Sequence, residues 1–156
     1  MSAARGRANQ SLYLARILLD AWGEALDRQE LPAGVISQAY LPAVKLHLEH
    51  AYGWFLLAIV QADLLPDRPP ARSDELPPVP EGKVVPGEIR ELSQLESAGW
   101  LADMLSRAPL VAATRPARRD NLVVAAPATP GPAEARDWLT KLAALFERMG
   151  DSLDEY

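Results

Sequence analysis

Four tryptophans are spread along this chain so that each falls in a different segment with helical periodicity: Trp22, Trp54, Trp100 and Trp138. A tryptophan side chain buries roughly 150–250 Å². One such anchor in each segment therefore predicts four helices that meet around a shared core. The sequence predicts an all-α fold, and within that class a four-helix bundle.

The composition narrows the functional classes. The chain has 156 residues, which fits one helical domain over residues 1–156. It contains no cysteine, so disulfides and cysteine-ligated metals are excluded, and we expect a protein of the bacterial cytoplasm. A net charge of −5 argues against nucleic-acid binding. The longest apolar run, Trp54 to Val60, is far shorter than the roughly 20 residues that span a membrane.

The first helix is expected from about Asn9 to Gln29, with Asn9 or Ser11 as its cap. Apolar residues recur every three or four positions, which places them on one helical face. They are Leu12, Ala15, Leu19, Trp22 and Leu26.

The second helical segment contains Pro42, which disturbs a helix interior. Either a short helix ends near Tyr40 and another begins at Pro42, or one long helix passes through the proline. From Ala43 to Leu65 the helical pattern is strong, and the run around Trp54 is apolar on every side. This pattern predicts the most buried helix of the fold.

Residues 66–87 hold seven of the 14 prolines and little apolar periodicity. We interpret them as a long Pro-rich crossover between helices 2 and 3, extended in the polyproline manner. Its length suits a connection between the two ends of a bundle.

The third helix is expected from Gly87 to Arg107, with Gly99 inside it to let a neighbour approach closely. Between helices 3 and 4, residues 108–131 contain two short apolar runs around a polar turn. That pattern is typical of a small hairpin, and an extended loop is the alternative.

The fourth helix should begin at Pro132, a favoured first helical position, and end before Gly150. After it we expect an acidic, mobile tail over residues 151–156. The helix has the clearest apolar stripe of the chain: Ala135, Trp138, Leu139, Leu142, Leu145, Phe146 and Met149.

A candidate polar cluster brings together both histidines of the chain. His47 and His50 share one helical face, and Asp20 and Glu24 are one turn apart on the first helix. If these helices pack antiparallel, the carboxylates can approach the histidines, with Tyr52 nearby. The favoured interpretation is a buried hydrogen-bonded network. The alternatives are a metal site and acid–base catalysis.

The spacing itself speaks against metal chemistry. Di-iron bundles use Glu-x-x-His pairs, but Glu49 directly precedes His50, and a His-Glu-x-x-His motif is absent. Gly-rich phosphate loops and nucleophile elbows are absent too. We therefore predict no catalytic residue, no metal and no cofactor.

A second candidate site is the arginine group of residues 115–119: Arg115, Arg118 and Arg119. Guanidinium groups hold phosphates or carboxylates by forked hydrogen bonds, so the trio is a candidate patch for an anion or a partner. An ordinary solvated surface turn is the favoured interpretation.

Three blocks of sequence resemble a small uncharacterised family of proteobacterial helical proteins. They are SLYLARILLDAW at 11–22, HLEHAYGWFLL at 47–57 and LSQLESAGWL at 92–101. The resemblance covers most of the chain. It implies no known activity and adds no site residue.

For function, the sequence favours a non-enzymatic cytoplasmic interaction or accessory protein that binds an unknown protein partner or forms a homodimer. One alternative is a metal-binding or acid–base helical bundle that uses His47 and His50. Another is a small-molecule sensor with an apolar pocket between Trp54 and Trp100. Neither nucleic acid nor a membrane is an expected partner.

Overall fold

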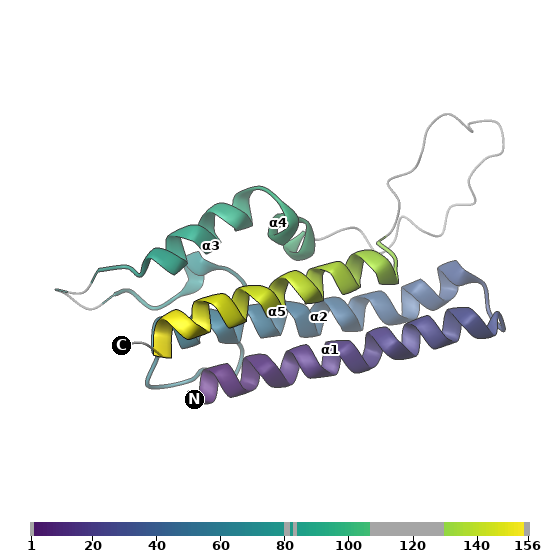
Figure 1. Ribbon diagram of the computed structural model, residues 1–156, viewed down its shortest axis with the longest axis horizontal. Coiled ribbons are helices and arrows are strands. Elements are labelled where there is room, and N and C mark those ends of the chain that lie inside the picture. The colour runs from purple at the N-terminus through teal and green to yellow at the C-terminus, as the bar shows by residue number, and fades with distance from the viewer. Residues whose placement is uncertain (1, 80–81, 83, 107–129, 155–156) are drawn as a thin grey trace.

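The computed structural model describes residues 2–79, 82, 84–106 and 130–154. All regular structure in these residues is helical, which confirms the predicted all-α class. The three long helices α1 (Ala3–Arg28), α2 (Ala33–Ile59) and α5 (Pro132–Asp154) run side by side (Figure 1). Two shorter helices, α3 (Gly87–Ser97) and α4 (Trp100–Leu105), pack on the side of α2 and α5. The expected hairpin or loop at 108–131 lies almost wholly outside the described residues, as do Arg115, Arg118 and Arg119.

Helix α1 begins six residues earlier than predicted, because Ser2 is the cap rather than Asn9 or Ser11. The Ser2 hydroxyl accepts a hydrogen bond from the backbone N–H of Arg5 at 3.2 Å. Ala4 and Ala8 then extend the buried stripe toward the N-terminus. The helix ends where Gln29 adopts the left-handed conformation, with φ of 54°.

Helix α2 is one continuous helix through Pro42, which decides between the two alternatives left open by the sequence. A proline removes the hydrogen bond to the carbonyl four residues earlier, here that of Gln38. Gln38 is exposed, so water can replace that bond. Further along, every residue of Ala51–Ile59 is buried, which confirms the prediction of an enclosed helix. Phe55 stacks on Phe146 of α5 with ring centroids 4.0 Å apart.

Helices α1 and α2 form an antiparallel hairpin whose register is set by two ring contacts. Trp22 stacks on Tyr40 with ring centroids 6.4 Å apart. The Arg7 guanidinium lies over the Trp54 ring, 4.7 Å from its centroid. In this register, residue 46 of α2 lies at the level of residues 15 and 16 of α1.

The prediction of a single helix over residues 87–107 is wrong, since a break at Ala98–Gly99 divides this segment into α3 and α4. Gly99 has φ of 112° and ψ of −162°, a backbone conformation that residues with a Cβ rarely adopt. A Cβ at Gly99 would meet nothing within 4 Å, so close approach is not its purpose. The four-helix bundle therefore stays a prediction, with its third member in two pieces.

The two short helices are held to the long ones by polar contacts. The Lys45 ammonium group of α2 donates a hydrogen bond to the Ser106 carbonyl, at the C-terminal end of α4. Arg148 of α5 makes two hydrogen bonds to the Glu91 carboxylate of α3, at 2.5 and 3.3 Å. Both contacts place α3 and α4 along the same side of the hairpin as α5.

Helix α5 begins at Pro132 as predicted, and the Gly131 backbone N–H donates to the Glu134 carboxylate across its first turn. All seven residues of its predicted stripe are buried. The predicted end before Gly150 is wrong, because the helix continues to Asp154. Gly150 lies inside the helix, where a Cβ would meet the Arg5 guanidinium, the end of a flexible side chain.

The Pro-rich crossover is packed against α2 at Gly53. A Cβ at this position would overlap the Pro70 carbonyl oxygen and lie 2.7 Å from the Pro69 Cβ. The crossover then forms a short 3₁₀ helix, η1 (Ser73–Glu75), before it reaches α3. No helix in the described residues combines the length and hydrophobicity that crossing a bilayer requires.

We expect Gly53→Ala to destabilise the fold by about 1–3 kcal/mol, because the added methyl group must displace the crossover backbone. Gly23→Ala in α1 is the matched control, since a Cβ there meets nothing within 4 Å. That control should gain about 0.5–1 kcal/mol from helix propensity. Urea denaturation measures both changes, and equal effects of the two substitutions would contradict the tight packing at Gly53.

Candidate functional site

The most connected polar group of the described structure is the Glu96 carboxylate of α3. Its Oε1 atom accepts hydrogen bonds from the Tyr52 hydroxyl of α2 and, at 2.7 Å, from the Ser73 backbone N–H of η1. Its Oε2 atom accepts a hydrogen bond from the Ser73 hydroxyl at 2.9 Å. One carboxylate thus joins α2, the crossover and α3. We call these three residues the Glu96 clip.

Tyr52 is held protonated in this clip. Its pKa is raised far above the ordinary value, first because burial disfavours the phenolate, then because of the hydrogen bond to Glu96 and the charge of that carboxylate. Arg72 opposes the shift. A phenol that keeps its proton at ordinary pH serves as a hydrogen-bond donor and not as a base, so the clip is suited to holding structure.

The histidines lie apart from the clip, half-buried on α2. The pKa of His50 is lowered, mainly because burial disfavours the charged ring, and further by the charges of His47 and Arg68. His50 is therefore neutral at pH 7. A cation beside the pair also opposes the binding of a metal ion.

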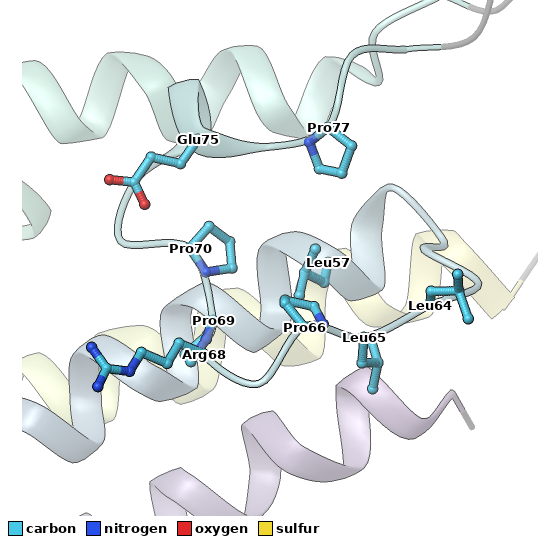
Figure 2. Close-up of a pocket in the computed structure, with 9 residues that line it drawn as sticks. All are labelled: Leu57, Leu64, Leu65, Pro66, Arg68, Pro69, Pro70, Glu75 and Pro77. Carbon is cyan, nitrogen blue, oxygen red and sulfur yellow. The ribbon is translucent and has the colours of Figure 1, made fainter.

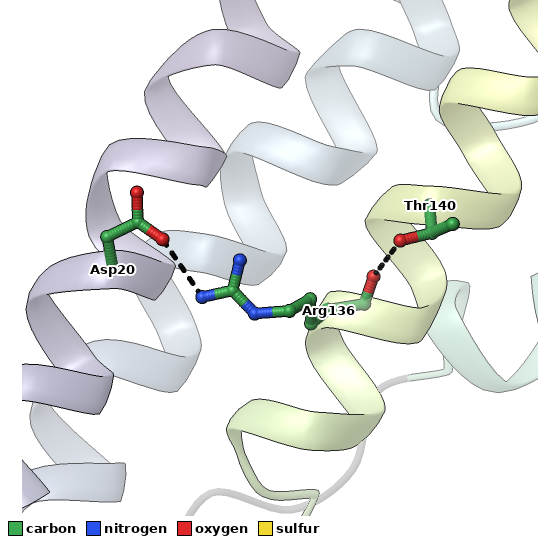
Figure 3. A network of polar contacts seen from close by, with 3 residues as sticks. All are labelled: Asp20, Arg136 and Thr140. Carbon is green, nitrogen blue, oxygen red and sulfur yellow. Dashed lines mark hydrogen bonds and ion pairs between the residues drawn. The ribbon is translucent and has the colours of Figure 1, made fainter.

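The carboxylates predicted beside the histidines bond elsewhere. The Asp20 Oδ1 atom pairs with the Arg136 Nη2 atom of α5 at 3.0 Å (Figure 3). The Arg136 carbonyl in turn accepts a hydrogen bond from the Thr140 hydroxyl at 2.9 Å. Glu24 lies 4.0 Å from Arg28 of its own helix. Both ion pairs are exposed to solvent.

The register of the hairpin explains this correction. His47 lies at the level of residues 14 and 15 of α1, so Asp20 is about five residues, or roughly 8 Å, farther along the helix. Helical spacing placed the two carboxylates one turn apart, but only the length of the turn between α1 and α2 determines what they face. Across the described ranges, no three His, Cys, Asp or Glu side chains gather as a metal-binding group.

Glu96 and Ser73 were missed by the sequence reasoning. The sequence signal that could have indicated the clip was Tyr52, which carries a hydroxyl group in an otherwise apolar helical run. A buried tyrosine hydroxyl needs a hydrogen-bond partner. The partner's identity depends on the path of the crossover, which has no periodic pattern to read.

An apolar groove of about 650 Å³ lies between the end of α2 and the crossover (Figure 2). Leu57 and Leu65 line it together with Pro66, Pro70 and Pro77. The sensor alternative placed a pocket between Trp54 and Trp100, and neither tryptophan lines this groove.

Removal of the clip should destabilise the fold. In Glu96→Ala the buried Tyr52 hydroxyl loses its acceptor, at a cost of about 1–3 kcal/mol. Glu96→Gln keeps an acceptor oxygen and should lose less. Glu91→Ala, which breaks the exposed pair with Arg148, is the control and should cost at most about 1 kcal/mol. Chemical denaturation of the three variants tests this order, and equal losses in Glu96→Ala and Glu91→Ala would contradict it.

His50 should make stability fall in mild acid. Below the ordinary histidine pKa of 6.5 the unfolded chain binds a proton that the folded protein resists, because its His50 pKa is lowered. The free energy of unfolding should therefore decline as the pH falls from about 7.5 to about 5.5. Urea titrations across this range should show a smaller decline for His50→Gln. An unchanged decline in the variant would assign the effect to other groups.

No curated protein and no solved structure matches the chain. One family does match, over residues 1–156, and it is described as a family of unknown function (DUF6586). The uncharacterised family that the sequence predicted is thereby confirmed: the chain belongs to DUF6586.

Proposed function

We propose that this protein is a non-enzymatic cytoplasmic interaction or accessory protein, and that it binds its partner through the outer side of the α1–α2 hairpin. The supporting observation is a set of four large apolar side chains that are about half exposed. They are Tyr13 at 57%, Ile17 at 47%, Val35 at 50% and Leu46 at 48%. We call this set the hairpin face.

Helical geometry brings Tyr13, Ile17 and Leu46 together, while Val35 lies about three turns from Leu46 along the same stripe of α2. Tyr13 and Ile17 are one turn apart on α1, and Val35 and Leu46 are three turns apart on α2, so each pair shares a face of its helix. The register of the hairpin puts Leu46 at the level between Tyr13 and Ile17. Single exposed apolar residues are common on proteins, but a contiguous group is typical of an interaction site.

The alternatives receive less support. The hypothesis of a metal or acid–base site at His47 and His50 also needs the carboxylates of Asp20 and Glu24. Both carboxylates pair with arginines instead. The groove beside Leu57 has a volume within the range of ligand pockets, which supports a sensor as the second candidate. We favour the hairpin face because ligand pockets enclose most of their ligand, whereas the groove wall includes Leu64, which is 89% exposed.

Photo-crosslinking in the producing cell tests the proposal. Ile17 is replaced by p-benzoylphenylalanine, and Leu64, an exposed apolar residue between α2 and the crossover, receives the same replacement as the matched control. We expect a discrete crosslinked product from position 17 that position 64 does not form, and its mass spectrum identifies the partner. Absence of any specific product from position 17 would refute a binding role for the hairpin face.

A further inference from the structure

We infer that the groove beside Leu57 binds a small amphipathic carboxylate, which is a molecule with one anionic head and an apolar chain. Arg68 holds the head, and the leucine and proline side chains of the groove cover the chain. The groove shares no residue with the hairpin face. The inference therefore goes beyond the proposed function and can be tested separately from it.

The groove is apolar at one end and charged at the other. Figure 2 shows Leu64 at one end, and Arg68 and Glu75 at the opposite end. Leu57 and Pro66 lie between them. Leu64 is 89% exposed, so an apolar chain that lies in the groove removes apolar surface from water. This arrangement fits a ligand that is itself apolar at one end and charged at the other.

The charge that lacks a counterion at this end of the groove is positive. Arg68 is exposed, and its side chain makes no ion pair and no hydrogen bond with any residue that the structure describes. Glu75, in contrast, already accepts a hydrogen bond from the Ala71 backbone N–H at 2.8 Å. A guanidinium group binds a carboxylate through two parallel hydrogen bonds, so Arg68 is suited to the head of the ligand.

The influence of Arg68 on His50 supports a positive potential at this place. The pKa of His50 is lowered first by burial, and then by the charges of His47 and Arg68. A carboxylate held close to Arg68 would offset the effect of its charge on His50. The lowered pKa therefore agrees with an arginine whose charge the described residues leave without a counterion.

The size and charge of the groove favour a small ligand with a single negative charge. Its volume of about 650 Å³ lies within the range of small-molecule pockets, about 300–1,000 Å³. A protein partner usually contacts about 20–30 residues on each side, whereas nine residues line this groove. The Glu75 carboxylate lies at the same end as Arg68 and repels a second negative charge, so a carboxylate fits better than a phosphate.

The crossover wall of the groove is held in place by the rest of the fold. Pro69 and Pro70 pack on α2 at Gly53, where a Cβ has no room. Farther along the crossover, the Glu96 clip fixes Ser73. Because the crossover is fixed at both points, little conformational entropy is lost when the ligand binds. The open shape of the groove makes the expected affinity modest.

An NMR titration of the isotope-labelled protein tests the inference with two probes that share a chain and differ in the head, octanoate and octanol. We expect octanoate to shift the amide signals of Leu64, Leu65 and Arg68. Octanol should bind at least about tenfold more weakly, because it lacks the charge that Arg68 holds. Equal affinities would overturn the inference, and so would the absence of octanoate binding at millimolar concentration.

Two substitutions separate the head of the ligand from its chain. Arg68→Gln should weaken octanoate binding about tenfold and leave octanol binding unchanged, because only the cation is removed. Leu64→Ser should weaken both ligands severalfold, because an apolar wall is removed. Both side chains are exposed, so neither change should lower stability. Equal octanoate affinities of the wild-type protein and Arg68→Gln would overturn the inference.

Arg90→Gln is the matched control, since Arg90 is an exposed arginine of α3 outside the groove, and it should change neither affinity. Octyl phosphate, whose head carries more than one negative charge at neutral pH, should bind less tightly than octanoate. Tighter binding of octyl phosphate would reject a carboxylate as the ligand. Because the crosslink from position 17 does not involve the groove, failure of this inference leaves the proposed function standing.

Discussion

The structure is organised around one constraint, namely that the C-terminal third of α2 is buried over its whole circumference. Nine consecutive residues, Ala51–Ile59, are buried, so this part of the helix must be enclosed on every side. Helix α1 covers one side through Trp54, α5 covers another through Phe55, and the crossover covers a third at Gly53. The crossover is thus part of the core's enclosure as well as a connection.

Enclosing α2 buries the Tyr52 hydroxyl, and the position of α3 follows from it. A buried hydroxyl without a partner costs free energy, and Glu96 supplies the acceptor. The same carboxylate binds Ser73 through backbone and side chain, so the crossover and α3 are held in one arrangement. A polar requirement of the core therefore specifies where the outer elements lie.

Periodic features could be predicted from the sequence, whereas features set by single residues or by loop lengths could not. All seven residues of the α5 stripe are buried, and Trp22, Trp54 and Trp138 are core residues as expected. The early start of α1 depends on one hydroxyl, Ser2, and the break between α3 and α4 depends on the backbone angles of Gly99. Neither has a periodic signature.

The candidate site was predicted less well than the fold. Helical spacing predicts that His47 and His50 share a face of α2, but the partners of Asp20 and Tyr52 depend on contacts between helices. Those contacts are set by the turn between α1 and α2 and by the path of the crossover. Both depend on tertiary packing, which local pattern does not encode.

The order of the helices along the chain has a consequence for folding. Helices α1 and α2 are joined by a turn of four residues, so their contacts are local and form quickly, whereas α5 begins at Pro132. During synthesis the hairpin therefore emerges with Phe55 still lacking its stacking partner, Phe146. The interval before α5 is made is the time at which the nascent chain is most exposed to aggregation, and at which a chaperone would act.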